Sequence, residues 1–135
     1  MSYLRHTFKI LDDPNPNNSD TVGNVHTVVP SDIDDIDDAS QKWHLVITVS
    51  QANGATSPTT DVIIETSFDG GNSWAEVGKS TQLTADGSAT EIVEPKALGP
   101  HLRAKKVLGG GGKPDSTAVV LLASNGLFKA ADTGA

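Results

Sequence analysis

The sequence contains no cysteine, few aromatic residues and no long apolar run, and each absence excludes a class of structure. Without cysteine the chain forms no disulfide and no zinc site built on thiolates. Phe, Trp and Tyr make up only 4% of the residues, so the core must be built from Val, Ile, Leu and Ala. No segment approaches the roughly 20 apolar residues of a membrane-spanning helix. The sequence therefore predicts a soluble protein that makes no contact with a membrane.

Positive charge is also scarce. The formal net charge is -7 at pH 7, and basic residues cluster only at Arg103, Lys105 and Lys106. A nucleic-acid partner would require a concentrated basic patch that neutralises phosphates, so none is expected. Residues 1–10 lack an apolar core of signal-peptide length. We therefore expect that the protein, if it leaves the cell, does not use an obvious signal peptide.

Short segments with strand character fill most of the chain. The sequence has 13 Gly and 7 Pro in 135 residues, which indicates many turns, and no stretch shows a strong helical pattern. The pattern predicts an all-β protein with one antiparallel β-sandwich over residues 41–130 and a frayed tail at 131–135. Both a jelly-roll and an immunoglobulin-like strand order fit the sequence. The clearest predicted strands are 43–49, 61–67, 101–108 and 117–123.

Residues 1–40 differ in composition and predict an extended N-terminal arm. Residues 12–20 contain no apolar residue except proline. Proline restricts itself and its predecessor to non-helical angles, so this part is expected to be an extended loop. The few large apolar side chains of the arm would be buried on a partner, and the arm would become ordered when it docks. The residues expected to make that contact are Tyr3, Phe8 and Ile10.

An acidic segment at the end of this arm is the best candidate for a metal site. Calcium takes about six to eight oxygen ligands, which clustered carboxylates can provide. The segment lacks the central glycine of an EF-hand loop. A solvated loop or a short capped turn of helix is the simpler interpretation, and a contact for a basic partner is a further alternative. No cofactor is expected. The candidate ligands are Asp32, Asp34, Asp35, Asp37 and Asp38.

No combination of residues predicts catalysis. The sequence has neither a cysteine nor the Gly-x-Ser-x-Gly pattern of a nucleophile elbow. The glycine run 109–112 precedes Pro114 and a predicted strand, whereas a phosphate-binding loop leads into a helix. We therefore expect that the protein is not an enzyme.

The segment TSFDGGNSW at residues 66–74 indicates a β-hairpin. Asp69 is placed to accept backbone N–H groups inside the turn, and Gly70 and Gly71 can adopt the positive φ angles that a tight turn needs. Trp74 is expected to pack back over the hairpin. The motif should be structural and should supply no catalytic group. Its residues are Ser67, Asp69, Gly71, Ser73 and Trp74.

This hairpin resembles the Asp-box of sialidases and related β-propellers, and also the hairpins of small β-sandwich proteins in tailed-bacteriophage particles. A full propeller would require several blades of about 40–45 residues each, which the chain cannot provide. The similarity to the phage proteins extends over residues 43–128 and includes LGPHLRAKKVL at 98–108 and STAVVLLAS at 116–124. His101 stands where related segments have an aromatic residue.

The resemblance implies a virion structural protein on the capsid surface, made in the host cytoplasm. The first expectation is a decoration or cement protein that binds the outer surface of a phage head and stabilises it. Its partners would be the major capsid protein or other virion proteins, together with copies of itself, a trimer being one form. Two alternatives stay open: a minor head–tail or tail protein, and a carbohydrate-binding or adhesive β-sandwich that needs an exposed aromatic platform.

Overall fold

The computed structural model describes residues 7–27, 43–54 and 56–124, and these residues form only strands and their connections. None of the described segments is a helix long and apolar enough to cross a membrane. The strands are β1 (Thr7–Asn17), β2 (Thr21–Val22), β3 (His26–Thr27), β4 (Trp43–Ala52), β5 (Thr59–Ser67), β6 (Ala75–Lys79), β7 (Gly87–Val93), β8 (His101–Gly109) and β9 (Asp115–Ser124).

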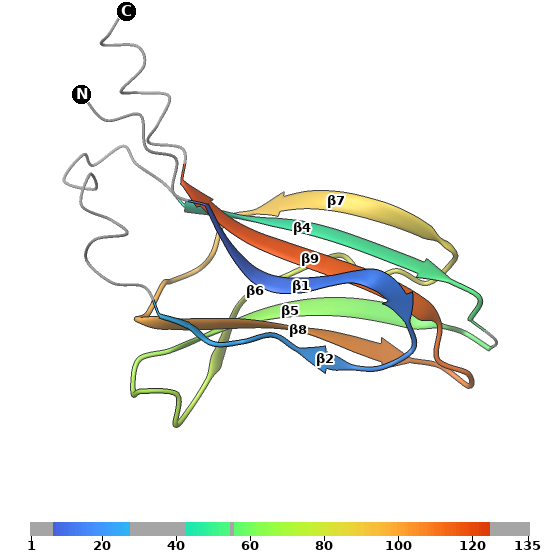
Figure 1. Cartoon of the computed structure of the whole chain (residues 1–135), viewed down its shortest axis with the longest axis horizontal. Helices are drawn as coiled ribbons and strands as arrows, with labels where there is room; N and C mark the ends of the chain where they lie inside the picture. Colours follow the sequence, from blue (N-terminus) through green and yellow to red (C-terminus); the bar gives the residue numbers. More distant parts are fainter. Residues whose placement is uncertain (1–6, 28–42, 55, 125–135) are drawn as a thin grey trace, which may run out of the picture.

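The strands form two antiparallel sheets that pack face to face, as the sequence predicts for a β-sandwich. The four-stranded sheet has the order β1-β9-β4-β7. The five-stranded sheet has the order β2-β8-β5-β6, and β3 also pairs with β8. Figure 1 shows the two sheets as separate layers, with β7, β4, β9 and β1 in one and β5, β8 and β2 in the other.

The strand order is that of a jelly roll. Strands pair from the outside of the sequence inwards: β1 with β9, β2 and β3 with β8, β4 with β7, and β5 with β6. Such nested pairing is what a folded-over antiparallel ribbon produces. An immunoglobulin-like sandwich keeps its last two strands in one sheet, whereas β8 and β9 lie in different sheets. The jelly roll is therefore the alternative that the structure supports.

Alternation along the strands builds an aliphatic core between the sheets. Every second residue of β8 is buried, from Leu102 to Leu108, because side chains of a strand point to opposite faces in turn. Aromatic side chains contribute only at the periphery, as the composition predicts. The buried cluster consists of Ile10, Leu11, Leu45, Ile47, Val49, Val62, Ile64, Val77, Leu102, Ala104, Ala118, Val120 and Leu122.

The start of the described chain corrects the prediction of an arm that runs to residue 40. Residues 7–17 form β1, which pairs with β9 at the edge of the four-stranded sheet. Ile10 and Leu11 are each only 2% exposed, so Ile10 packs inside its own domain and is not a partner contact. Phe8 is half-buried against the same core. Tyr3 lies outside the described residues.

The predicted loop at residues 12–20 is also wrong in its first half, because β1 continues to Asn17. The register of β1 against β9 shifts between Lys9 and Leu11 and again between Asp13 and Asn17. The first shift inserts an extra residue, which lets two successive side chains, Ile10 and Leu11, both face the core. Pro14 and Pro16 lie in the second shift on an edge strand, where a missing N–H is tolerated. The sandwich thus begins well before residue 41.

Candidate functional site

The hairpin between β5 and β6 is closed by two side chains, Ser67 and Asp69. The Ser67 hydroxyl donates to Asp69 Oδ1 at 2.7 Å and accepts the N–H groups of Gly71, at 2.9 Å, and Asp69, at 3.3 Å. Gly70 and Gly71 have φ angles of 75° and 94°, as the turn prediction requires. The hydroxyl of Ser67 therefore stabilises the start of the connection between β5 and β6.

The carboxylate of Asp69 fixes the far side of the same turn. It accepts the backbone N–H of Ser73 at 2.9 Å and the Ser73 hydroxyl at 2.5 Å. These bonds, the hydroxyl bond first, lower the pKa of Asp69 from 3.8 to about 2 because they stabilise the charged form. Trp74 folds back and donates its indole N–H to the carbonyl of Gly71 at 3.1 Å. All five predicted turn residues therefore meet in one hydrogen-bonded loop.

A charged cluster covers the outer face of Trp74. The Arg103 guanidinium lies 4.2 Å from the centroid of the Trp74 ring. Its Nε donates to Glu65 Oε1 at 2.8 Å, and Lys105 Nζ lies 3.4 Å from Glu65 Oε2. Arg103 and Lys105 thus share the outer face of β8. Since Arg103 occupies one ring face, Trp74 does not offer that face as an open platform for a sugar.

Phe68 is the exposed apolar residue of this hairpin, and it directly follows the end of β5. Its side chain is 68% exposed, although its neighbours Ser67 and Asp69 are fixed in the turn. Gly99 supports the base of the hairpin: its N–H donates to Thr66 Oγ1 at 2.8 Å. A Cβ atom added at Gly99 would meet the Ser67 carbonyl at 2.7 Å and Phe68 Cδ1 at 3.2 Å. The hairpin therefore holds an apolar ring outwards from an ordered base.

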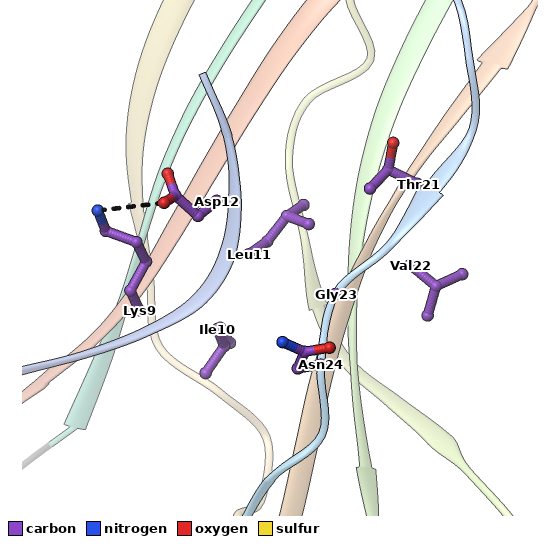
Figure 2. Close-up of a pocket in the computed structure, with 8 residues that line it drawn as sticks. All are labelled: Lys9, Ile10, Leu11, Asp12, Thr21, Val22, Gly23 and Asn24. Carbon is purple, nitrogen blue, oxygen red and sulfur yellow. Dashed lines mark ion pairs between the residues drawn. The ribbon is translucent and has the colours of Figure 1, made fainter. Parts of the chain in front are cut away.

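A hollow lies between the edge strands β1 and β2, on the open side of the sandwich (Figure 2). Its volume is about 240 Å³, which is below the roughly 300–1,000 Å³ of small-molecule sites. Its charged groups, Lys9 and Asp12, lie 3.6 Å apart and satisfy each other. The charged groups of the hollow are therefore already paired with each other. Its lining consists of Lys9, Ile10, Leu11, Asp12, Thr21, Val22, Gly23 and Asn24.

The predicted metal candidates Asp32, Asp34, Asp35, Asp37 and Asp38 lie outside the described residues. Within residues 7–27, 43–54 and 56–124, no group of three or more His, Cys, Asp and Glu side chains is placed to hold a metal ion. Calcium binding by the acidic segment stays a prediction.

Lys106 is an unusual component of the core, because it is a charged residue with no solvent exposure. It lies on β8 in the inward-facing series with Leu102 and Ala104. The alternation of the sequence places these three residues on one side of the strand. The structure confirms this side for Lys106, whereas Arg103 and Lys105 of the same basic cluster lie on the other face of β8. The sequence signal for a buried lysine is its position on the same side of the alternation as apolar core residues.

The Lys106 side chain crosses the core to the opposite sheet. Its Nζ lies 2.6 Å from Asp13 Oδ2 and donates to Asn17 Oδ1 at 3.0 Å, both on β1. It also donates to the backbone carbonyl of Ser116, on β9, at 3.1 Å. Three acceptors therefore satisfy the three donors that a lysine ammonium carries.

Asp13 joins the members of this cluster. Its Oδ1 accepts the side-chain N–H of Asn17 at 2.8 Å, and its Oδ2 also accepts the Thr21 hydroxyl at 3.2 Å. Only 14% of the Asp13 side chain is exposed. An amine, a carboxamide and a carboxylate therefore lie in mutual contact where little water reaches them. We call Asp13, Asn17 and Lys106 the inter-sheet cluster.

No protein-family model matches the chain, and no curated protein matches it. The geometry of the fold and of the polar clusters therefore supplies the argument about function.

Proposed function

We propose that the protein is a non-catalytic structural component of a bacteriophage particle. In this proposal it is a decoration or cement protein that binds the outer surface of the head, with the major capsid protein and copies of itself as partners. The jelly roll is used by viral capsid domains and by lectins alike, so the fold agrees with this role without selecting it. The resemblance of the hairpin and of residues 98–108 to phage proteins is the reason for proposing a role in a phage particle.

The observation that carries the proposal is the exposed ring of Phe68. An exposed aromatic ring on a hydrogen-bonded turn loses little conformational freedom when it is buried on a partner, because Ser67 and Asp69 already fix its backbone. Aromatic residues dominate the energetics of protein interfaces. A turn closed by several side-chain hydrogen bonds thus presents the residue type that a docking contact needs.

The polar clusters support a structural role as well. Glu65 is bound by Arg103 and Lys105. Asp69 is hydrogen-bonded within its own turn, and its lowered pKa keeps it ionised at neutral pH. A catalytic base is tuned towards the working pH, and the shift of Asp69 is in the opposite direction.

The first test is the protein composition of purified phage particles from the source of this chain. Quantitative mass spectrometry should find the protein in many copies per particle, in proportion to the major capsid protein. A few copies per particle would indicate a head–tail or tail component instead. Absence from the particle would overturn the proposal.

The second test distinguishes the exposed ring of Phe68 from other surfaces. Particles that lack the protein are mixed with purified variants and sedimented. Phe68→Ser should bind at least tenfold more weakly than the wild type, whereas Ile92→Ser should bind normally. Ile92 is a matched control, because it is 70% exposed and lies on β7 in the other sheet. The reverse result would place the contact on β7.

A further inference from the structure

The inter-sheet cluster contains the groups that an intramolecular amide bond requires. We propose that Lys106 Nζ becomes covalently joined to the side-chain carbonyl carbon of Asn17, with Asp13 as the proton carrier. The product is a cross-link between β8 and β1, and hence between the two sheets. This inference does not rest on the proposed role in a phage particle.

The positions of the three side chains match the three roles. The nucleophile, Lys106 Nζ, lies 3.0 Å from the carbonyl oxygen of the Asn17 carboxamide. The Asp13 carboxylate contacts the attacking nitrogen through Oδ2 at 2.6 Å and the departing nitrogen, Asn17 Nδ2, through Oδ1 at 2.8 Å. One carboxylate therefore touches both atoms between which a proton must move.

The reaction balances without an oxidant or a reductant. A proton passes from the Lys106 ammonium to Asp13, and the freed amine lone pair attacks the Asn17 carbonyl carbon to form the new C–N bond. Asp13 then donates its proton to Asn17 Nδ2 as the old C–N bond breaks. The second proton lost by Nζ leaves with the ammonia. An ammonium and a primary amide thus become a secondary amide and an ammonium ion.

Burial favours this outcome over a permanent ion pair. Lys106 has no solvent exposure, and a charge held in the interior carries a desolvation cost that its partner repays only in part. Amide formation removes the lysine charge from the core and releases the ammonium ion to water. Reacting groups that are fixed in contact also gain the large rate advantage of intramolecular reactions.

The surrounding chain keeps the three groups in place. Pro14 and Pro16 restrict the backbone between Asp13 and Asn17. The side chains of Asp13 and Asn17 also hydrogen-bond to each other. The carbonyl of Ser116 gives Nζ a third partner and fixes its direction. The new bond would join positions 89 residues apart in the sequence.

The deciding experiment is the mass of the intact, purified full-length chain. We expect a mass lower than that of the sequence by about 17 Da, the loss of one ammonia. Proteolysis and tandem mass spectrometry should then find a branched peptide that joins Asn17 to Lys106. A chain of full mass after prolonged incubation at neutral pH would overturn the proposal.

The variant Lys106→Arg shows whether a loss of ammonia comes from the proposed cross-link or from another site. The dipeptides Asn53–Gly54 and Asn125–Gly126 can lose ammonia by cyclising onto the backbone, and that loss would persist in Lys106→Arg. The proposed loss must disappear in Lys106→Arg, because guanidinium stays protonated and does not attack. A loss that maps only to either dipeptide overturns the cross-link.

Asp13→Asn tests the proton carrier. It keeps Asn17 and Lys106 but should show at least tenfold less linked peptide after the same incubation. Undiminished linkage would overturn the role of Asp13. Where a variant does not fold, the presence or absence of the branched peptide in the wild-type chain decides the proposal alone.

Discussion

Ser73 binds both oxygens of the Asp69 carboxylate, through its backbone N–H at 2.9 Å and its hydroxyl at 2.5 Å. One residue thus secures the carboxylate that closes the β5–β6 turn. Because these bonds need the ionised form, the stability of the hairpin is linked to pH.

Asp69→Asn should lower the free energy of unfolding at neutral pH. It should also remove the part of the stability loss in acid that comes from protonation of Asp69. The pKa of Asp69 falls from 3.8 to about 2 on folding, so its contribution is present above 3.8 and is lost as the pH falls through about 2. Urea midpoints of wild type and variant should therefore converge over this range. Asp86→Asn, at an exposed position, should leave the pH profile unchanged. A constant gap between wild type and Asp69→Asn would contradict the linkage.

Ile10→Ala should reduce the free energy of unfolding by about 2–5 kcal/mol, the usual cost of a cavity in a packed core. Val22→Ala, at a position that is 60% exposed, should change it by no more than about 0.5 kcal/mol. Urea denaturation measures both. Equal, small effects would mean that β1 is a detachable arm after all.

Deletion of residues 1–17 should abolish cooperative unfolding, because it removes the whole of β1 and uncovers β9. Deletion of residues 1–6 leaves β1 intact and should keep a cooperative transition. Circular dichroism during thermal unfolding distinguishes the two. A folded 1–17 deletion would show that the sandwich closes without its first strand.

Arg103→Ala should expose Trp74 to a collisional quencher and cost about 0.5–1 kcal/mol, the range of a cation–π contact near the surface. The measurement is acrylamide quenching of fluorescence in a Trp43→Phe background, where only Trp74 emits. Lys105→Ala is the matched control, because Lys105 contacts Glu65 but no contact of Lys105 with the Trp74 ring is found. Equal quenching in the two variants would argue against the stacking.

Gly99→Ala should destabilise the hairpin base by about 1–3 kcal/mol, since the added methyl group would lie 2.7 Å from the Ser67 carbonyl. Nuclear magnetic resonance should show shifted signals for residues 66–74. Ala97→Ser, at an exposed neighbouring position, should leave those signals in place. If particle binding is measured as well, Gly99→Ala should weaken it through the displaced Phe68.

The sequence predicts what depends on neighbours along the chain. Alternation in residues 101–108 places Leu102, Ala104 and Lys106 on one face, and the structure buries all three. The turn at residues 66–74 is equally local, because Asp69 bonds only to residues within it. Local signals of this kind determine strand faces and tight turns.

Features that depend on the pairing of strands far apart in the sequence cannot be predicted from local signals of this kind. The jelly-roll order follows from which strands meet, for example β1 with β9, and alternation within each strand fits either candidate topology. Alternation over residues 3–11 indicates a short edge strand, but it places Ile10 and Leu11 on opposite faces, whereas a register shift turns both side chains inwards. Pro14 and Pro16 suggest a loop, and only the edge position of β1 makes a strand possible there. The inter-sheet cluster likewise requires knowledge that β1 lies opposite β8.

The prolines of the edge strand β1 affect how copies of the protein can associate at high concentration. Among the described strands, β1 borders the four-stranded sheet, and Pro14 and Pro16 remove two N–H donors from a margin whose register is already broken twice. A strand from another molecule finds no continuous row of donors and acceptors to extend. Many copies could therefore be held close together without fusing along this side into fibrils.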